Sequence, residues 1–430
     1  MLQLKVIRDD NKRIVNGLRK RNWSAQQLKV IQQILDTDDR RRSTQKELDD
    51  LLAEAKRLAN QIGQLMGQGK KEEAEALKAK VAQLKEQTKS LEEQFAALKK
   101  QLDELLYTVP NCPHKSVPKG KTADDNKVAK AWTKAMPELP ADALPHWDLA
   151  KKYKLFDFEL GVKLTGAGFP VYRGKGAKLQ RALIQLMLDE HSKAGFTESY
   201  LPYMLSEASL YAAGQLPKFR DNLYRDAEED YFFIPTAEVA FVNLYRDEII
   251  PPGQLPMRFV GHTPCFRREK MSAGRDVRGI KRGHQFEKVE MFVYCEPDRS
   301  GEELEALLVR ACSIPEKLGL PYRVLALCSG DIGFNSTKTF DLEIWAPGQG
   351  EWLEVSSASN CLDFQARRAN IRYRTAADAP TAYPHMLNAS GLALPRTLIA
   401  VMENYQREDG SIGVPEALQS YMGIDVIPAV

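Results

Sequence analysis

The chain has 430 residues, with 61 Lys and Arg against 58 Asp and Glu, a net charge of +3 and 43% hydrophobic residues. This length predicts two or three domains with their own cores, and the nearly balanced charge neither requires nor excludes a nucleic-acid partner. The six cysteines show no Cys-x-x-Cys spacing, which argues for a reducing compartment and against a disulfide framework or zinc ribbon. We find no signal sequence and no apolar run of the roughly 18 residues that a membrane span needs, so we expect a cytoplasmic protein without a membrane partner.

A short helical start is expected over residues 1–23, and a much stronger pattern follows it. Residues of the apolar stripe recur every three or four positions on both sides of Gly67-Gln-Gly69; they are Leu48, Leu51, Ala55, Leu58, Ile62 and Leu65, then Leu77, Val81, Leu84, Thr88, Leu91, Phe95, Leu98, Leu102 and Leu105. This pattern predicts a long antiparallel coiled coil closed by a glycine turn. Its first helix begins near Ala25, and the polar interval 38–47 breaks the stripe. Helices of about 40 residues each would span about 60 Å.

This helical arm has two interpretations. A coiled coil usually serves as an oligomerisation element or a spacer, and a solvated helix surface needs no ligand. However, the glycine turn lets the two helices of one chain satisfy each other. Residues 54–100 also hold ten Lys or Arg against seven Asp or Glu. A rigid and slightly positive arm suits contact with a nucleic-acid backbone.

Residues 107–126 are rich in proline and charge, which is typical of a linker. We therefore place an N-terminal domain at 1–110, a linker at 111–126 and a larger domain at 127–430. Mixed helix and strand patterns in the larger part predict an α+β domain. The amphipathic pattern of 177–195 predicts a helix that ends at glycine, with a strand at 196–201 after it. The apolar face of that helix suits either the core or a dimer interface.

Residues 265–294 form the most informative stretch, with alternating polar and apolar ends around a basic, glycine-rich middle. The pattern predicts an antiparallel hairpin with a long tip. Side chains two apart in a strand share a face, so we expect Arg267 beside Glu269 and Phe286 on the same face as Glu290. A guanidinium, two carboxylates and an aromatic ring could clamp a nucleotide. An ordinary hairpin with a solvated basic loop is the alternative.

Three further motifs carry polar groups at the ends of predicted elements. Thr236 is a good N-cap for a helix after Pro235, with Glu238 in its first turn. Glu354 and Ser357 stand at the predicted end of the return strand of a second hairpin, where hard oxygen atoms could hold Mg²⁺. Arg396 follows a proline suited to the first turn of a helix, where backbone amides favour anions.

Together these pieces resemble the three signature motifs of class II aminoacyl-tRNA synthetases, and the details are similar to seryl-tRNA synthetases. The motifs that carry the resemblance are the helix ending at Gly195, Phe266-Arg267 with the loop to Phe286, and the segment 391–396 that ends in Arg396; they are joined by 236–238, 272–276, 284–286, 354–357 and 387–391. The resemblance covers essentially the whole chain. It implies a class II antiparallel sheet flanked by helices, with the coiled-coil arm at its N-terminus.

The resemblance also implies a role for individual residues. Arg267 and Arg396 would be catalytic, with ATP bound by Arg267, Arg268, Glu269, Phe286, Glu354, Val355, Ser356, Ser357 and Arg396. Serine would be bound by Thr236, Ala237, Glu238, Glu290, Asn388 and Ser390, and Mg²⁺ by Glu354 and Ser357. Arg268, Lys270, Met271 and Ala389 depart from the common family pattern, the first three near the expected contact with the tRNA acceptor end.

The implied reaction is activation of L-serine with ATP to seryl-adenylate, followed by transfer of the seryl group to the 3′ end of serine tRNA. The arm would embrace the long variable arm of that tRNA, and the catalytic domain would form a homodimer; selenocysteine tRNA is a further candidate acceptor. Two alternatives belong to other classes. One is a ligase that loads an amino acid onto a carrier protein, and the other is a catalytically silent nucleic-acid-binding relative.

Overall fold

The computed structural model describes residues 1–270 and 278–429, which divide into two compact units. One unit comprises Leu2–Arg19 and Trp23–Val109, and the other comprises Met1, Lys20–Asn22 and Pro110–Val430. The domain boundaries predicted above, 1–110, 111–126 and 127–430, remain our proposal. In the described part of the chain, no helix is both long enough and apolar enough to cross a membrane.

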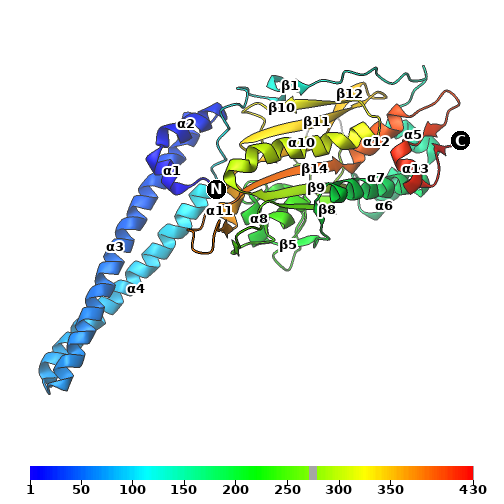
Figure 1. Cartoon of the computed structure of the whole chain (residues 1–430). Helices are drawn as coiled ribbons and strands as arrows, with labels where there is room; N and C mark the ends of the chain where they lie inside the picture. The colour runs from blue at the N-terminus through cyan, green and yellow to red at the C-terminus, as the bar shows by residue number, and fades with distance from the viewer. Residues whose placement is uncertain (271–277, 430) are drawn as a thin grey trace. The chain divides into compact units, whose positions relative to one another are not determined.

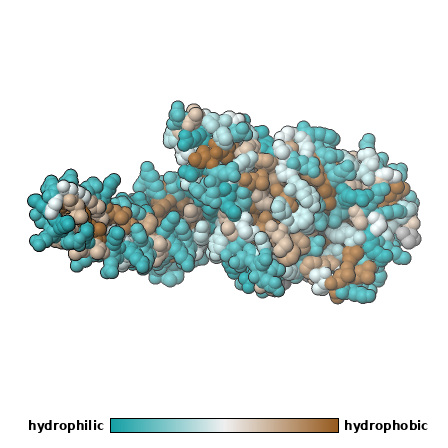
Figure 2. All heavy atoms as spheres, turned by 90° about the horizontal axis from the view of Figure 1, so that it is seen from below, coloured by the Kyte–Doolittle hydropathy of each residue, from teal (hydrophilic) through white to brown (hydrophobic). Residues whose placement is uncertain are grey.

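The N-terminal unit is a helical arm (Figure 1). Its elements are α1 (Leu4–Asp9), α2 (Asn11–Lys20), α3 (Ala25–Gly67) and α4 (Lys71–Tyr107). Ser24 caps α3 with a reciprocal capping box to Gln27, and Gly69 adopts φ +78° in the turn to α4, a conformation that glycine tolerates best. Every residue of the predicted apolar stripe is buried or half-buried, while hydrophilic side chains cover most of the outer surface (Figure 2). The predicted hairpin is therefore present.

The first helix runs from Ala25 through the polar interval 38–47, as the sequence predicted, although this interval breaks the apolar stripe. Asp38 is fully buried inside the arm unit. Its carboxylate accepts hydrogen bonds from Arg41 Nη2 at 2.8 Å and from Arg8 of α1. Two guanidinium groups thus neutralise the buried charge, which lets α3 continue through the polar stretch.

The larger unit is built on one mixed sheet of eight strands. Their order is β1 (Lys127–Lys130), β10 (Tyr322–Ala326), β11 (Lys338–Ala346), β12 (Glu351–Asn360), β14 (His385–Ala393), β9 (Gln285–Cys295), β8 (Met257–Phe266) and β4 (Thr197–Glu198). All neighbours are antiparallel except β4 and β8. The predicted strand at 196–201 is thus wrong in extent, because only two residues pair with β8 before the chain turns away.

Helices and short strands complete this unit. The helices are α5 (His146–Tyr153), α6 (Phe158–Leu164), α7 (Gly174–Lys193), α8 (Glu207–Ala213), α9 (Ala237–Val242), α10 (Ser300–Lys317), α11 (Phe364–Arg368), α12 (Leu394–Asn404) and α13 (Glu416–Met422). The short strands pair as β2 (Phe156–Asp157) with β3 (Val171–Tyr172), β5 (Met204–Ser206) with β6 (Tyr231–Phe233), β7 (Ile249–Ile250) with β13 (Arg372–Tyr373), and β15 (Ile412–Gly413) with β16 (Val426–Ile427). The sheet crosses the body with α10 lying along it (Figure 1).

The two faces of the sheet have different partners, as alternation along β9 shows. Val289, Met291 and Val293 belong to the larger core, which includes residues of α7, α10 and α12. Phe292 and Tyr294 point to the other face and join a second core with residues of α8, α9 and α11. Toward the N-terminal end of β9, before Phe292, that second face is not covered by apolar residues. Polar side chains stand there and form the floor of a cavity.

Candidate active site

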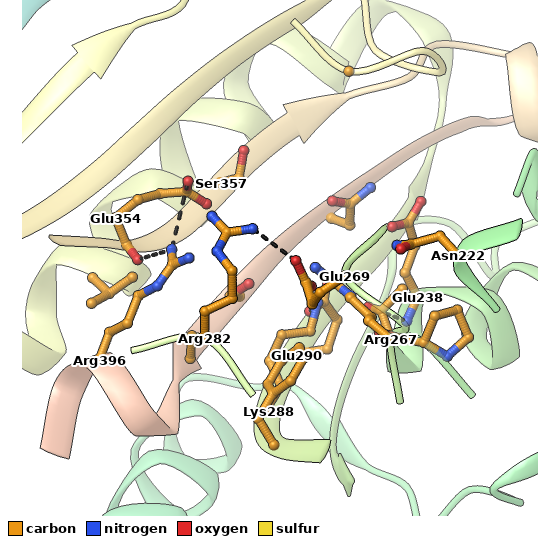
Figure 3. Close-up of a pocket in the computed structure, with 18 of the residues that line it drawn as sticks. Asn222, Glu238, Arg267, Glu269, Arg282, Lys288, Glu290, Glu354, Ser357 and Arg396 are labelled. Carbon is orange, nitrogen blue, oxygen red and sulfur yellow. Dashed lines mark hydrogen bonds and ion pairs between the residues drawn. The ribbon is translucent and has the colours of Figure 1, made fainter. Parts of the chain in front are cut away.

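A cavity of about 570 Å³ lies over β9, β14 and β12 (Figure 3). Its volume falls within the usual range for small-ligand sites. Among the residues predicted from the sequence, those that line it are Thr236, Glu238, Arg267, Glu269, Phe286, Glu290, Glu354, Val355, Ser357, Asn388, Ser390 and Arg396. Segments far apart in the sequence therefore meet in one place.

The floor of the cavity follows from strand alternation. Phe286 and Glu290 are four residues apart in β9, with Lys288 between them on the same face. Ser390 of β14 stands directly opposite Glu290, so its side chain points to the same side of the sheet. Asn388 follows two residues away along β14. Four polar groups and one ring from two strands thus face the same space.

Arg267 is fixed against the ring of Phe286. Strand β8 ends at Phe266, so the prediction that Arg267 and Glu269 share one face of a strand is wrong. The Arg267 backbone nevertheless donates to His284 O at 2.8 Å, and its Nε donates to Pro235 O at 3.1 Å. Its guanidinium carbon lies 5.1 Å from the Phe286 ring centroid. Cation–π contact and two hydrogen bonds hold this charge in place.

Glu269 reaches the cavity by a different route from the predicted one. Its φ of +49° turns the chain out of the extended conformation just after β8. Its Oε2 accepts a hydrogen bond from Arg282 Nη1 at 2.8 Å. Figure 3 shows this pair in the middle of the site, between Arg267 and Arg396. The pair joins the two ends of the β8–β9 connection on either side of residues 271–277.

Arg396 stands at one end of the cavity, near Glu354. It lies in the first turn of α12 after Pro395, as the sequence predicted. Its Nη1 donates to the backbone oxygen of Glu354 at 2.6 Å and lies 3.6 Å from that residue's Oε2. The Glu354 side chain is 50% exposed, so its carboxylate is open to a ligand. This end can accept the charged part of a nucleotide.

A β-bulge sets the geometry beside Glu354. Glu354 pairs with Glu343 of β11 and Ser357 pairs with Asp341, which leaves one extra residue in β12. Two residues three positions apart therefore share a face, which a regular strand would forbid. The prediction that they stand at the strand end is wrong, because β12 continues to Asn360.

Ser357 and Glu354 provide oxygen atoms of the kind that Mg²⁺ prefers. The Ser357 hydroxyl donates to Asp341 Oδ1 at 2.5 Å, which leaves its lone pairs directed elsewhere. Burial, together with the nearby Glu354 carboxylate, raises the pKa of Asp341 well above its usual range. Among the described residues there is no cluster of three or more His, Cys, Asp or Glu suited to a metal. Mg²⁺ typically needs only one or two protein carboxylates, so the donor set fits that ion.

The opposite end of the cavity holds two carboxylates, that of Glu238, which is half-buried, and that of Glu290, which is buried. Thr236 caps α9, accepting from the Glu238 backbone N–H at 3.3 Å as the sequence predicted. Glu238 Oε1 accepts a hydrogen bond from Gln365 Nε2 at 2.7 Å. Burial, and then the charge of Glu290, raises the pKa of Glu238. Glu290 is compensated by Lys288, whose Nζ lies 2.5 Å from its Oε2.

Three predicted residues do not line this cavity. The Arg268 guanidinium lies 5.7 Å from the Tyr224 ring, and Ala237 is fully buried in α9. The Ser356 hydroxyl donates to Ser390 O at 2.6 Å, linking β12 to β14. Met271 and the motif 272–276 lie outside the described residues.

Several residues of the site were not predicted: Lys288 and Arg282 line the cavity, while Asp341 and Gln365 hydrogen-bond to residues that line it. Lys288 had a visible signal, because it alternates with Phe286 and Glu290 along one strand. Arg282 belonged to the basic stretch of the predicted hairpin tip, but nothing in the sequence indicated its partner. Asp341 shared a face with Glu343 in a predicted strand. Gln365, which holds Glu238, comes from α11 and had no sequence signal.

The fold and the site can now be compared with known proteins. Residues 218–405 match the tRNA synthetase class II core domain (G, H, P, S and T). The unit built on the eight-stranded sheet thus contains the core domain of a class II aminoacyl-tRNA synthetase. Residues 1–113, which contain the arm, match the seryl-tRNA synthetase N-terminal domain.

Whole-chain relatives narrow this class to one family. Serine–tRNA ligase of Thermomicrobium roseum is 49% identical, over 98% of this chain and 94% of its own. Serine–tRNA ligase of Dehalococcoides mccartyi is 47% identical, over 99% of this chain and 100% of its own. The solved seryl-tRNA synthetase of Pyrococcus horikoshii complexed with ATP gives a TM-score of 0.92 at 36% identity and covers 100% of both chains. The chain belongs to the seryl-tRNA synthetase family.

Proposed function

We propose that the cavity over β9, β14 and β12 is the site at which this chain, a serine–tRNA ligase by family, activates L-serine with ATP. The observation that carries the proposal is that one cavity holds two arginines, Arg267 and Arg396, together with two carboxylates, Glu238 and Glu290. The arginines suit a polyphosphate and the carboxylates suit an ammonium group. Relatives of the same name match the chain over nearly its full length, so a carrier-protein ligase or a silent relative is not favoured.

At the nucleotide end, the adenine ring would lie on Phe286, with Glu269 accepting from its amino group. Arg267 would contact the α-phosphate. Its guanidinium is held next to Phe286, on which the adenine would lie, and this position supports the role. Arg396 would bind the γ-phosphate, because it stands at the far end of the cavity from Glu238 (Figure 3). Charged groups that are fixed before the substrate arrives stabilise developing charge without reorganisation.

At the other end, Glu238 would accept the ammonium group of serine, whose positive charge would relieve the cost of burying this carboxylate. Glu290 would accept from the hydroxyl, together with Thr236, Asn388 and Ser390. Alanine would leave these groups unpaired, and sites of this kind reject such an analogue by about 10⁴ to 10⁵. Threonine would be rejected only through its extra methyl group, which is a weaker form of selection.

Glu354 and Ser357 would hold Mg²⁺, which when bound would neutralise the phosphate charge. The chain's own contribution is a carboxylate already oriented by Arg396 and a hydroxyl oriented by Asp341. Residues that hydrogen-bond to the ligands of a metal ion commonly fix the orientation of those ligands in this manner.

The reaction needs no nucleophilic side chain. An oxygen of the serine carboxylate forms a bond to the α-phosphorus, and the bond from that phosphorus to the bridging oxygen breaks, so that diphosphate leaves with its electron pair. A ribose hydroxyl at the 3′ end of tRNA then attacks the carbonyl carbon of seryl-adenylate, and AMP leaves. Alignment and charge neutralisation dominate catalysis of this kind.

Three further parts of the proposal concern tRNA binding, the homodimer and the location of the protein in the cell. The helical arm would bind the long variable arm of serine tRNA, since its exposed surface carries several lysines in α4. Two chains would form a homodimer, with α7 near the interface. The protein would act in the cytoplasm, with selenocysteine tRNA as a further candidate acceptor.

The test is serine-dependent exchange between ATP and labelled diphosphate, with alanine, threonine and glycine in parallel, followed by aminoacylation of serine tRNA. We expect strong exchange with serine, none above background with alanine or glycine, and stable serylation of the tRNA. Exchange without serylation would favour the carrier-protein ligase. No exchange with any of the four amino acids would refute the proposed activity.

A further inference from the structure

The carboxylate of Glu403 is a buried junction outside the cavity. Glu403 lies in the last turn of α12, seven residues after Arg396, and its side chain is fully buried. It accepts from Gly348 N at 2.9 Å and from Gln349 Nε2 at 3.1 Å, both in the β11–β12 turn. It also accepts from the backbone N–H of His146 at 2.8 Å. One carboxylate thus ties together α12, the β11–β12 turn and the start of α5.

The imidazole of His146 extends this junction to the connection that enters β9. Its Nδ1 lies 3.1 Å from Glu403 Oε1, and its Nε2 lies 3.2 Å from the backbone N of Ile280. Since the Ile280 N–H can only donate, Nε2 is the acceptor, and Nδ1 carries the proton that faces Glu403. The imidazole ring is fully buried.

The approach between this ring and the chain beside Ile280 is very close. Gly279 adopts φ +68°, and a Cβ atom there would lie 1.9 Å from His146 Nε2. Next to it, the Arg278 guanidinium lies 4.7 Å from the ring of Trp147, the second residue of α5. The first two residues of α5 therefore contact two consecutive residues, Arg278 and Gly279, of the segment that leads into β9.

The segment held in this way enters the proposed ATP site. Ile280, Lys281 and Arg282 all line the cavity. Arg282 donates to Glu269, while Lys281 forms an ion pair with Glu351 of β12. Arg396 Nε lies 3.5 Å from Lys281 O. A shift of this segment would thus move the contacts of two cavity arginines together.

We propose that His146 and Glu403 are positioning residues for nucleotide binding, because they fix segment 278–282 relative to the helix that carries Arg396. This inference rests on the proposed ATP site. Neither residue lines the cavity, so they act only through the segment they hold. The competing interpretation is a buried pair that contributes stability and nothing else.

Two substitutions separate the bonds made by the imidazole. The amide of His146→Asn replaces Nδ1 and keeps a donor for Glu403, but it leaves the Ile280 N–H without an acceptor. The amide of His146→Gln replaces Nε2 and keeps an acceptor for Ile280. Glu303→Gln serves as a matched control, since it weakens the ion pair between the buried Glu303 carboxylate and the partly exposed Arg258, neither of which borders the cavity.

The first measurement is the KM for ATP in serine-dependent diphosphate exchange. We expect a rise of about five- to tenfold in His146→Asn, the scale of one hydrogen bond, with kcat changed by less than about twofold. His146→Gln and Glu303→Gln should stay within about twofold in KM despite a similar fall in Tm. Equal effects on KM in the two His146 variants, or an equal rise in Glu303→Gln, would overturn the inference.

The second measurement is hydrogen exchange of the Ile280 amide, which does not depend on any activity. Faster hydrogen exchange of this amide in His146→Asn but not in His146→Gln would support the proposal that His146 holds segment 278–282. Unchanged hydrogen exchange in both variants would refute it. If the His146 variants fail to fold, Gly279→Ala disturbs the same contact from the other side and should raise the KM for ATP; an unchanged KM in that variant would refute the inference. If the unmodified chain shows no serine-dependent diphosphate exchange, the proposed function is refuted. The hydrogen exchange of the Ile280 amide would still decide whether His146 holds segment 278–282.

Discussion

The arm and the cavity use charged side chains in opposite ways. On the arm, pairs such as Lys78 with Glu75 stand in solvent, with side chains 46% and 69% exposed. In the cavity, Lys288 and Glu290 form a pair with side chains only 9% and 2% exposed. Exposed pairs contribute between 0 and about 1 kcal/mol, whereas removing one partner of a buried pair typically costs several. Substitutions should therefore act sharply in the cavity and gradually on the arm.

The largest effect is expected from Arg267→Ala. This arginine is held by Pro235 O and by the Phe286 ring, so its loss would remove a fixed charge from the proposed position of the reacting phosphate. Serine-dependent diphosphate exchange should fall by about 10³-fold, since loss of one such group costs about 10² to 10³. Arg246→Ala is the control, because that guanidinium bonds to Ser209 Oγ away from the cavity. A fall of less than about tenfold in Arg267→Ala would remove this arginine from the mechanism.

Glu238→Gln should separate activity from stability. We expect kcat/KM for serine to fall by about 10²-fold, because the proposed ion pair with the ammonium group would be lost. Tm should rise by about 1 to 2 °C, the equivalent of about 1 kcal/mol in a unit of this size, because the cost of desolvating this carboxylate is removed. A lower Tm would show that the carboxylate stabilises the free protein.

The difference in Tm between Glu238→Gln and the unmodified protein should depend on pH, and the sign of that dependence follows from the pKa of Glu238. Burial raises the pKa of Glu238 in the folded chain above the unfolded value of about 4.3. As pH rises above that unfolded value, the unfolded state loses its proton first, so the stability of the unmodified protein falls until the folded pKa is passed. The Tm advantage of Glu238→Gln should therefore be larger at pH 8 than at pH 5. Thermal melts at both values measure it, and an equal or reversed difference would contradict the assigned shift.

Ser357→Ala should have a smaller effect that Mg²⁺ can reverse. Removing one neutral oxygen ligand leaves Glu354 in place, so the Mg²⁺ concentration for half-maximal exchange should rise by about three- to tenfold. Excess Mg²⁺ should restore most of the rate. Ser313→Ala, whose hydroxyl donates to a backbone oxygen within α10, should not shift this concentration. A rate loss that Mg²⁺ does not restore would argue for a structural role of Ser357.

The smallest effect is expected on the arm. Reversing two exposed charges of α4 with Lys85→Glu and Lys89→Glu should leave diphosphate exchange unchanged. The KM for serine tRNA should rise by about threefold, and more at low salt, because phosphate contacts are screened by ions. Glu86→Lys with Glu93→Lys should act in the opposite direction. Identical tRNA kinetics in all forms would exclude this face of α4 from binding.

The arm was the easier region to predict because its structure depends on contacts that repeat along the sequence. The stripe from Leu48 to Leu105 and the glycine turn determined both long helices without reference to the rest of the chain. Asp38 was the exception, since one of its two partners, Arg8, belongs to another helix. A buried charge can be understood only when all of its partners are known.

The cavity was predicted in part. Alternation and helix signals gave the positions of Phe286, Glu290, Thr236 and Arg396, and the family resemblance supplied their roles. The approach of Gln365 to Glu238 joins residues 127 positions apart, which no local pattern encodes. Strand ends were also misjudged, because the point at which β8 stops depends on the turn at Glu269 rather than on propensity.

The bulge in β12 means that the spacing of Glu354 and Ser357 along the chain differs from their spacing on the sheet. Val355 is the residue without a partner in β11, so a chain lacking it could form a regular ladder of the sort that protein designers favour. Glu354 would still pair with Glu343 and Ser357 with Asp341, and the two side chains would still share a face. A relative with one residue between its glutamate and serine could therefore present the same two oxygen donors. A search for this donor pair in other chains should accordingly follow the ladder pairing rather than a fixed number of residues.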